Sequence, residues 1–213
     1  APFDHECVFD SDTILEIEQL PRKITIIGAG VIGCEYACIF AKMGIRVNLI
    51  ARDRDILPFL DREISENLVF SMRNQRITLR LGENVKAIRK VGPQEMHVEL
   101  ESQKVLPCST VLVAAGRLAN SRDLGLEKVG VELGHNALIV TNEYHQTTLP
   151  NLYAAGDIIG FPGLASTSMI QARIAVLHAF RELQNESMPR EFPFGIWTIP
   201  PVAMVGKTEE ELT

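Results

Sequence analysis

The feature that most constrains this chain is a glycine pattern between an apolar run and a helix-like segment. Residues 23–27, KITII, form a nearly continuous β-branched run, which predicts a buried parallel strand. Three glycines follow at once in the spacing G-x-G-x-x-G, at Gly28, Gly30 and Gly33. The apolar positions of residues 31–42 predict a helix packed on a sheet, and residues 45–51 predict a second buried strand. Together these segments predict a βαβ unit with a right-handed crossover.

A G-x-G-x-x-G turn in this context is the fingerprint of a dinucleotide-binding site, although a merely structural turn is the alternative. The first glycine makes the tight turn, the second lets a pyrophosphate approach the backbone, and the third lets helix and strand pack closely. Unpaired N–H groups at the helix start then hold the anion. We therefore predict that residues 28–33, which include Val31 and Ile32, bind the pyrophosphate of a dinucleotide.

The end of the second strand bears on which dinucleotide binds. An NAD site usually has a carboxylate there, against the ribose 2′-hydroxyl, but this chain has Ala51. Arg52 and Arg54 follow, and either could bind the 2′-phosphate of NADP, although the two neighbouring aspartates partly offset their charge. The alternative is a solvated charged turn. The sequence therefore permits NADP and does not exclude NAD.

Three side chains of the first helix raise the question of further chemistry. Cys34 and Cys38 lie four residues apart, hence on one helical face, and we predict that they fill the core as inert thiols. Glu35 lies among apolar neighbours one turn into the helix. Either it has a cationic partner or a functional role, or it faces solvent where the helix dipole favours a carboxylate.

The remainder of the first half predicts an α/β domain. Residues 60–75 predict a helix with Asp61 as N-cap and one apolar face, made of Ile64, Leu68 and Met72. Residues 77–81 predict a third strand, and the short alternating segments of residues 84–106 predict a small antiparallel meander. Residues 109–117 return to the pattern of a buried strand, so we expect a domain boundary near Arg117.

A second glycine turn follows in NLYAAGD, residues 151–157, which we interpret as a short buried strand. Its end, Gly156-Asp157, could present a carboxylate to a sugar hydroxyl and an N–H to a phosphate, although an ordinary turn is the alternative. Residues 165–183 predict a helix of about five turns. A further strand within residues 196–206 and a capping box at residues 208–212 complete the pattern, and we expect the final domain to be cut short.

Composition excludes several classes of function. The net charge of −6 argues against a nucleic-acid-binding protein, because such proteins rely on Lys and Arg. No apolar run reaches the roughly 20 residues that a transmembrane helix needs, and the acidic N-terminus is unlike a signal peptide, so we expect no membrane and a cytoplasmic location. The five histidines show no ligand spacing, and we expect no metal site.

Five stretches together resemble the pyridine nucleotide-disulfide oxidoreductase family of flavoproteins, and within it the soluble transhydrogenase branch. They are IIGAGVIGCEYACIF, VLVAAGR, YAAGDIIG, LAS and PFGIWTIPPVAMVGKTEEEL. The resemblance implies an α/β fold: a Rossmann-like, three-layer ββα NAD(P)-binding domain over residues 1–117, with a parallel sheet and a small meander. It further implies that residues 118–188 are the returning part of an FAD-binding domain and that residues 189–213 begin a dimerisation domain. The chain would then be a fragment without its first FAD-binding segment.

The resemblance also implies roles for individual residues. Glu35 matches a glutamate beside the nicotinamide, the catalytic candidate, whose lysine partner is absent from this chain. Gly116 and Arg117 match a loop of the nucleotide site. Asp157, after Gly156, matches an aspartate that contacts FAD, and Leu164 and Ala165 match backbone near the flavin ring.

The implied activity is hydride transfer between NADPH and NAD through FAD, in a protein that forms a homodimer at full length. The alternatives are an NADPH-dependent disulfide reductase, similar to glutathione reductase or lipoamide dehydrogenase, and an isolated nucleotide-binding module without activity. The cysteine region that would separate the first two does not occur in this sequence.

Overall fold

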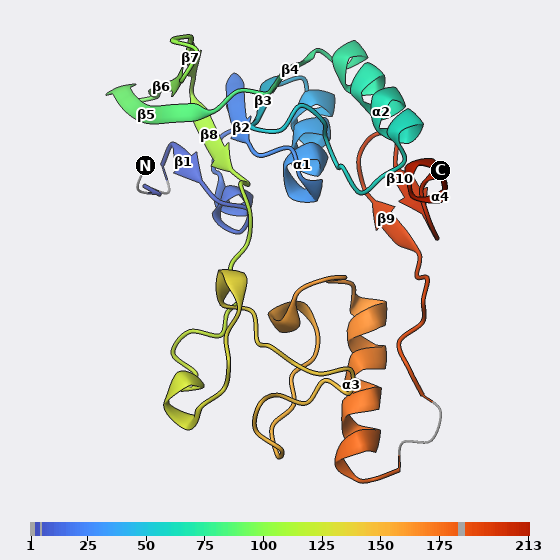
Figure 1. The fold of residues 1–213 in the computed structure, drawn as a ribbon. Helices are drawn as coiled ribbons and strands as arrows, with labels where there is room; N and C mark the ends of the chain where they lie inside the picture. Colours follow the sequence, from blue (N-terminus) through green and yellow to red (C-terminus); the bar gives the residue numbers. More distant parts are fainter. Residues whose placement is uncertain (1–2, 5, 183–185) are drawn as a thin grey trace. The chain divides into compact units, whose positions relative to one another are not determined.

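The computed structural model describes residues 3, 4, 6–182 and 186–213, which fall into two units (Figure 1). The first unit contains the residues up to Gly116 together with Gly195–Thr213, and the second contains Arg117–Phe194. The second unit is therefore inserted into the sequence of the first.

A parallel sheet forms the centre of the first unit. Its strands lie in the order β1-β8-β2-β3-β4, and all neighbouring pairs whose register is known are parallel. The strands are β1 (Val8–Phe9), β2 (Lys23–Ile27), β3 (Arg46–Ala51), β4 (Ile77–Leu81) and β8 (Thr110–Val113). The buried β-branched runs thus form interior strands, as predicted, and the two-residue β1 forms one edge.

Two helices cross over between these strands. Helix α1 (Val31–Lys42) follows the glycine turn, and α2 (Arg62–Asn74) begins after Asp61, whose side chain accepts the Glu63 N–H at 3.0 Å. The predicted apolar face of α2 is partly wrong, because Ile64 is exposed while Leu68 and Met72 are buried. The buried face instead includes Ser65.

An antiparallel meander covers the other face of the sheet, opposite α1 and α2 (Figure 1). Its strands are β5 (Val85–Gly92), β6 (Glu95–Leu100) and β7 (Val105–Cys108). A buried apolar cluster joins the two layers, with Met96, Val98 and Leu106 from the meander and Val8, Ile50 and Val111 from the sheet. Burial of this cluster stabilises the packing of the two layers. The observed layers confirm the predicted three-layer ββα arrangement with a parallel sheet and a meander.

The end of the chain returns to the first unit. It forms a two-stranded sheet, β9 (Phe194–Ile196) and β10 (Val202–Met204), and the short helix α4 (Glu209–Leu212). The predicted capping box is confirmed, since Thr208 and Glu211 exchange backbone-to-side-chain hydrogen bonds. Asp61 accepts the Glu209 N–H at 3.2 Å and Glu210 accepts the Arg62 N–H at 3.3 Å, so α2 and α4 cap each other.

The second unit is rich in loops around one long helix, α3 (Ala165–Ala179). The predicted strand at residues 151–157 is wrong, because only an isolated bridge joins Gln146 to Tyr153 there. Helix α3 ends before the predicted limit at residue 183, which lies outside the described residues. The short 3₁₀ helices of the chain are Thr13–Glu16, Glu127–Val129, His135–Ala137 and Asp157–Ile159.

Candidate functional site

The turn between β2 and α1 has a geometry that only glycine fits at two positions. Gly28 has a φ of +106°, and a Cβ there would lie 2.3 Å from the Ala114 carbonyl oxygen. A Cβ on Gly33 would lie 1.8 Å from the Gly28 carbonyl oxygen. The Gly28 N–H also donates to the Ile50 carbonyl at 2.8 Å. The turn is therefore packed tightly against the carboxyl ends of β3 and β8.

Gly30 has a different environment from the other two glycines. A Cβ on Gly30 would meet no atom within 4 Å, so the backbone is open on this side. The first intrahelical hydrogen bond of α1 runs from the Cys34 N–H to the Gly30 carbonyl at 3.0 Å. In the described part of the chain no acceptor is found for the N–H groups of Val31, Ile32 and Gly33. An open backbone edge with free donors at a helix N-terminus can bind an anion.

The residues predicted to choose the nucleotide lie at the same edge of the sheet. Ala51 ends β3 and is buried. Arg52 follows with a side chain that is 79% exposed, and its Nε lies 3.6 Å from Asp53. The exposed side chain of Arg54 passes Gly82, which follows β4, because a Cβ on Gly82 would lie 3.5 Å from the Arg54 Cγ. Neither guanidinium is buried, so both are accessible to a ligand.

Glu35 has a partner that sequence reasoning did not identify. Its Oε1 accepts the backbone N–H of Trp197 at 2.7 Å, and the side chain is half-buried. Among the described residues no Lys, Arg or His forms an ion pair with this carboxylate. Trp197 lies 162 residues away in the sequence, so no local pattern could have revealed the contact.

The cysteines of α1 fill the core, as predicted. Cys34 and Cys38 are fully buried and free. The Cys34 thiol donates to the Ala29 carbonyl at 3.4 Å, and burial raises its pKa to about 12. Burial also raises the pKa of Cys38. Because only the thiolate is a good nucleophile, neither thiol is suited to redox chemistry at neutral pH.

The second unit brings together its own group of predicted residues. Gly156 has a φ of +86°, and its N–H donates to the buried Gln171 side chain of α3 at 2.8 Å. The exposed Asp157 lies close to the loop before α3, because a Cβ on Gly163 would be 4.0 Å from its Oδ1. Gln171 was not predicted from the sequence, although a single amide in an apolar helix is a signal that could have indicated it.

The start of α3 lies beside this carboxylate. The Leu164 carbonyl accepts the Ser168 N–H at 2.9 Å, which is the first intrahelical bond, and also the hydroxyls of Thr167 and Ser168 at 2.9 and 2.8 Å. The N–H groups of the first turn, from Ala165 onward, thus have no acceptor within the helix. Gly116, with a φ of +134°, is the last residue of the first unit before the inserted second unit, which begins at the exposed Arg117.

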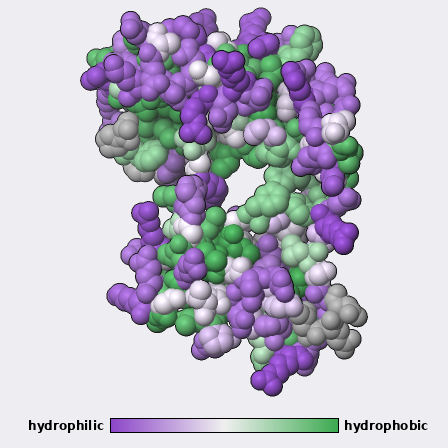
Figure 2. Space-filling model, in the orientation of Figure 1, coloured by the Kyte–Doolittle hydropathy of each residue, from purple (hydrophilic) through white to green (hydrophobic). Residues whose placement is uncertain are grey.

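Two further features, a metal-ligand cluster and a membrane-spanning helix, are absent from the described ranges. No three His, Cys, Asp or Glu side chains there are grouped to hold a metal ion. No helix there combines the length and the apolar character that crossing a membrane requires. Figure 2 shows hydrophilic residues over much of the visible surface of the first unit.

Comparison with known proteins gives consistent matches. A family model described as pyridine nucleotide-disulphide oxidoreductase matches residues 3–177. Soluble pyridine nucleotide transhydrogenases from Mycobacterium tuberculosis and Yersinia enterocolitica are each 42% identical to the chain and match 99% of it. The chain covers only 45% of the length of these relatives.

Solved structures also match. The HOCl-induced flavoprotein disulfide reductase RclA from Escherichia coli has 28% identity and a TM-score of 0.89 over 96% of this chain and 47% of its own. LpdA from Mycobacterium tuberculosis has 26% identity and a TM-score of 0.90 over 98% of this chain and 45% of its own.

Proposed function

Because this chain belongs to the pyridine nucleotide-disulphide oxidoreductase family, we propose that its first unit binds a nicotinamide dinucleotide at the turn of residues 28–33. The observation that carries the proposal is the open backbone at Gly30 beside three free N–H groups. These donors and the positive end of the α1 dipole would hold the pyrophosphate. A substrate phosphate can approach here because glycine leaves no side chain in the way.

We further propose that Arg52 and Arg54 make NADP(H) a substrate. Both guanidinium groups follow β3, where the adenosine ribose of such a dinucleotide lies, and Ala51 leaves no carboxylate to repel a 2′-phosphate. On the other side of the turn, Gly116 would line the path of the nicotinamide half, with Arg117 after it. Glu35, one turn into α1, would lie beside the nicotinamide.

The second unit would contribute to an FAD site. The Asp157 carboxylate would accept a hydrogen bond from a ribityl or sugar hydroxyl, and the free N–H groups that follow Leu164, from Ala165 onward, would face the flavin or a phosphate. These residues fit the group, since Gly156 and Gln171 hold the turn against α3. Bound FAD would accept and pass on the hydride.

For the full-length protein we propose hydride transfer between NADPH and NAD, as the names of the relatives indicate. The structural similarity to RclA favours a disulfide reductase as the second candidate. That reaction needs an accessible cysteine pair, whereas the cysteines at positions 7, 34, 38 and 108 are buried. The pair would therefore have to come from residues outside this chain. A homodimer remains a prediction, to be tested by light scattering.

Calorimetric titration with NADPH and NADH tests the nucleotide site. We expect wild type to bind, Gly30→Ala to lose binding, and Arg52→Ala to weaken NADPH without affecting NADH. Arg46→Ala is the matched control, since this exposed arginine begins β3 at the opposite end of the strand. Failure of wild type to bind either dinucleotide, or unchanged binding by Gly30→Ala, would refute the site.

Titration with FAD tests the second unit. We expect Asp157→Asn to weaken FAD retention, measured as flavin absorbance after gel filtration, relative to Asp123→Asn, which alters another exposed aspartate of the same unit. If the wild-type chain retains no FAD, this half of the proposal is wrong for the 213-residue chain.

A further inference from the structure

Residues Ile196–Ile199, here named the strap, form an extended segment fixed on the surface of the first unit. Ile196 and Thr198 are 1% and 2% exposed, whereas Trp197 between them is 76% exposed. This alternation is that of an extended chain with one buried side. Two buried anchors thus flank the Trp197 backbone and hold its N–H in one place.

The strap is also tied to helices α1 and α2. The Gln75 side-chain amide, at the end of α2, donates to the Ile199 carbonyl. The Ile199 backbone also contacts the Cys38 thiol of α1. Trp197 lies between Ile196 and Ile199 in the strap, and its N–H donates to the Glu35 Oε1 at 2.7 Å. This distance lies at the short end of the range for charge-assisted hydrogen bonds, so the carboxylate has a fixed direction.

The direction of this carboxylate matters for a bound dinucleotide. Glu35 is the fifth residue of α1, and the first three N–H groups of the helix are the proposed pyrophosphate donors. An unattached carboxylate could turn toward the phosphates and repel them. A carboxylate held by the strap instead keeps its charge in one position. Near a nicotinamide, that charge attracts the oxidised ring, which is cationic, more than the reduced ring, which is neutral.

We propose that the Trp197 N–H positions Glu35 so that its carboxylate favours oxidised over reduced nicotinamide dinucleotides. Trp197 is thus a positioning residue through its backbone, and Glu35 determines the preference for oxidation state. This inference rests on the nucleotide site proposed above. Its consequence is that the ratio of NADP⁺ to NADPH affinity is higher than it would be in a site without the carboxylate.

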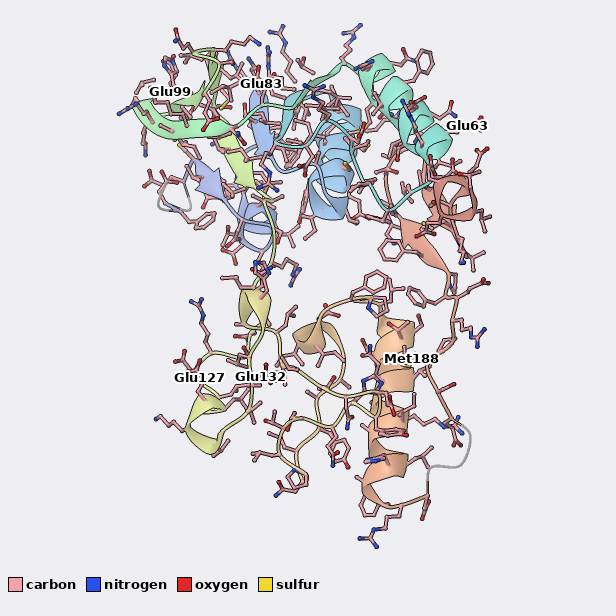
Figure 3. All side chains as sticks on the ribbon, in the orientation of Figure 1. Glu63, Glu83, Glu99, Glu127, Glu132 and Met188 are labelled. Atoms are coloured by element: carbon pink, nitrogen blue, oxygen red, sulfur yellow. The ribbon has the colours of Figure 1, made fainter. Side chains whose placement is uncertain are left out.

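Glu35→Gln tests the role of the charge. The glutamine keeps an oxygen that can accept the Trp197 N–H but carries no charge. We expect calorimetry to show that the ratio of NADP⁺ to NADPH affinity falls about two- to fivefold, the size of one partly screened charge pair. Glu63→Gln is the matched control, because Glu63 is an exposed glutamate in the first turn of α2 (Figure 3). Its ratio should equal that of wild type.

Trp197→Pro tests the positioning, because proline removes the N–H, and Trp197→Phe is the control that retains it. We expect Trp197→Pro to lower the affinity ratio when Glu35 is present and to have no further effect in a Glu35→Ala background. An equal effect in both backgrounds would overturn positioning through Glu35. If urea unfolding shows that Trp197→Pro does not fold, Glu35→Asp replaces it, because the shorter side chain keeps the charge but withdraws it from the N–H.

The outcomes separate this inference from the nucleotide site itself. If wild type binds neither dinucleotide, the site is wrong. If wild type binds both, Gly30→Ala abolishes binding and Glu35→Gln keeps the wild-type affinity ratio, only the inference about Glu35 is overturned. A salt titration gives a second readout, since the wild-type ratio should fall with ionic strength while that of Glu35→Gln stays constant.

Discussion

Replacing the glycines of the turn one at a time should separate packing from ligand binding. Gly33→Ala places a Cβ 1.8 Å from the Gly28 carbonyl oxygen, a contact with backbone that cannot rotate away. The turn and α1 must move apart by more than an ångström to reach an ordinary contact. Gly30→Ala adds a Cβ that meets no protein atom within 4 Å.

The two variants should differ in stability. For Gly33→Ala we expect the upper end of the cost of overpacking, about 3 kcal/mol or more, offset by about 1 kcal/mol from the better helix propensity of alanine. The free energy of unfolding of the first unit should thus fall by about 2 kcal/mol or more. Gly30→Ala should cost at most about 1 kcal/mol, because alanine is only a poorer N-cap than glycine.

Urea unfolding and calorimetric titration with NADPH measure both effects. Gly33→Ala should lose stability and binding together, whereas Gly30→Ala should lose binding alone. Gly195→Ala is the control, since its Cβ also meets no atom within 4 Å and should leave both quantities unchanged. A Gly33→Ala protein with wild-type stability would refute the packing argument, and a Gly30→Ala protein that still binds NADPH would refute the role of the open backbone.

Three further predictions concern other residues. Burial alone would raise the pKa of Asp4, but three backbone N–H groups on its Oδ1 and the charge of Lys90 outweigh burial and lower the pKa from 3.8. Its contribution to stability should therefore be present above about pH 4 and be lost as the pH falls through the folded-state pKa. Asp4→Asn should lower the free energy of unfolding by about 1–2 kcal/mol at pH 7, measured by urea unfolding. If the variant loses stability at acid pH as steeply as wild type does, the prediction is contradicted. Burial lowers the pKa of His145 from 6.5, so the unfolded state protonates first and the free energy of unfolding of the second unit should fall as the pH drops below 6.5. His145→Asn, which tolerates the φ of +61°, should abolish that decrease, and its persistence would exclude His145 as the cause. Finally, a disulfide reagent at neutral pH should react with no cysteine of the native chain and with all four cysteines after unfolding in urea. Fast labelling of the native chain would contradict this, because it would show that the cysteines are accessible.

Local patterns predicted much of the first unit because its elements are neighbours in sequence. The predicted helix at residues 31–42 matches α1, and the strands on either side are those of the βαβ unit. The same reasoning failed for Ile64, which was placed on the buried face because it precedes Leu68 by four residues and Met72 by twice that spacing. At about 100° per residue, Ile64 lies about 80° from Met72 around the helix axis, whereas Ser65 lies about 20° from it. The polar residue is therefore buried and the apolar one exposed.

Other features depended on contacts that no local pattern specifies. The run at residues 151–157 has the composition of a strand but pairs only through a single bridge, because the described second unit offers it no sheet to join. The donor to Glu35 could not be predicted, since Trp197 lies in a different segment and contributes a backbone group that any residue but proline would provide. The glycine turn between β2 and α1 could be predicted from its local pattern, whereas the strap beside it could not.

The insertion of one unit within the other has a consequence for biosynthesis. A ribosome adds about 5–20 residues per second, so Trp197, made 162 residues after Glu35, emerges about 8–30 s later. During that interval α1 can pack on its sheet, but the strap that lies against the side of the helix carrying Cys38 has not yet been made. Chaperones would have their best opportunity to engage the nascent chain there, and a synonymous codon change that slows translation of residues 117–194 would lengthen that exposure.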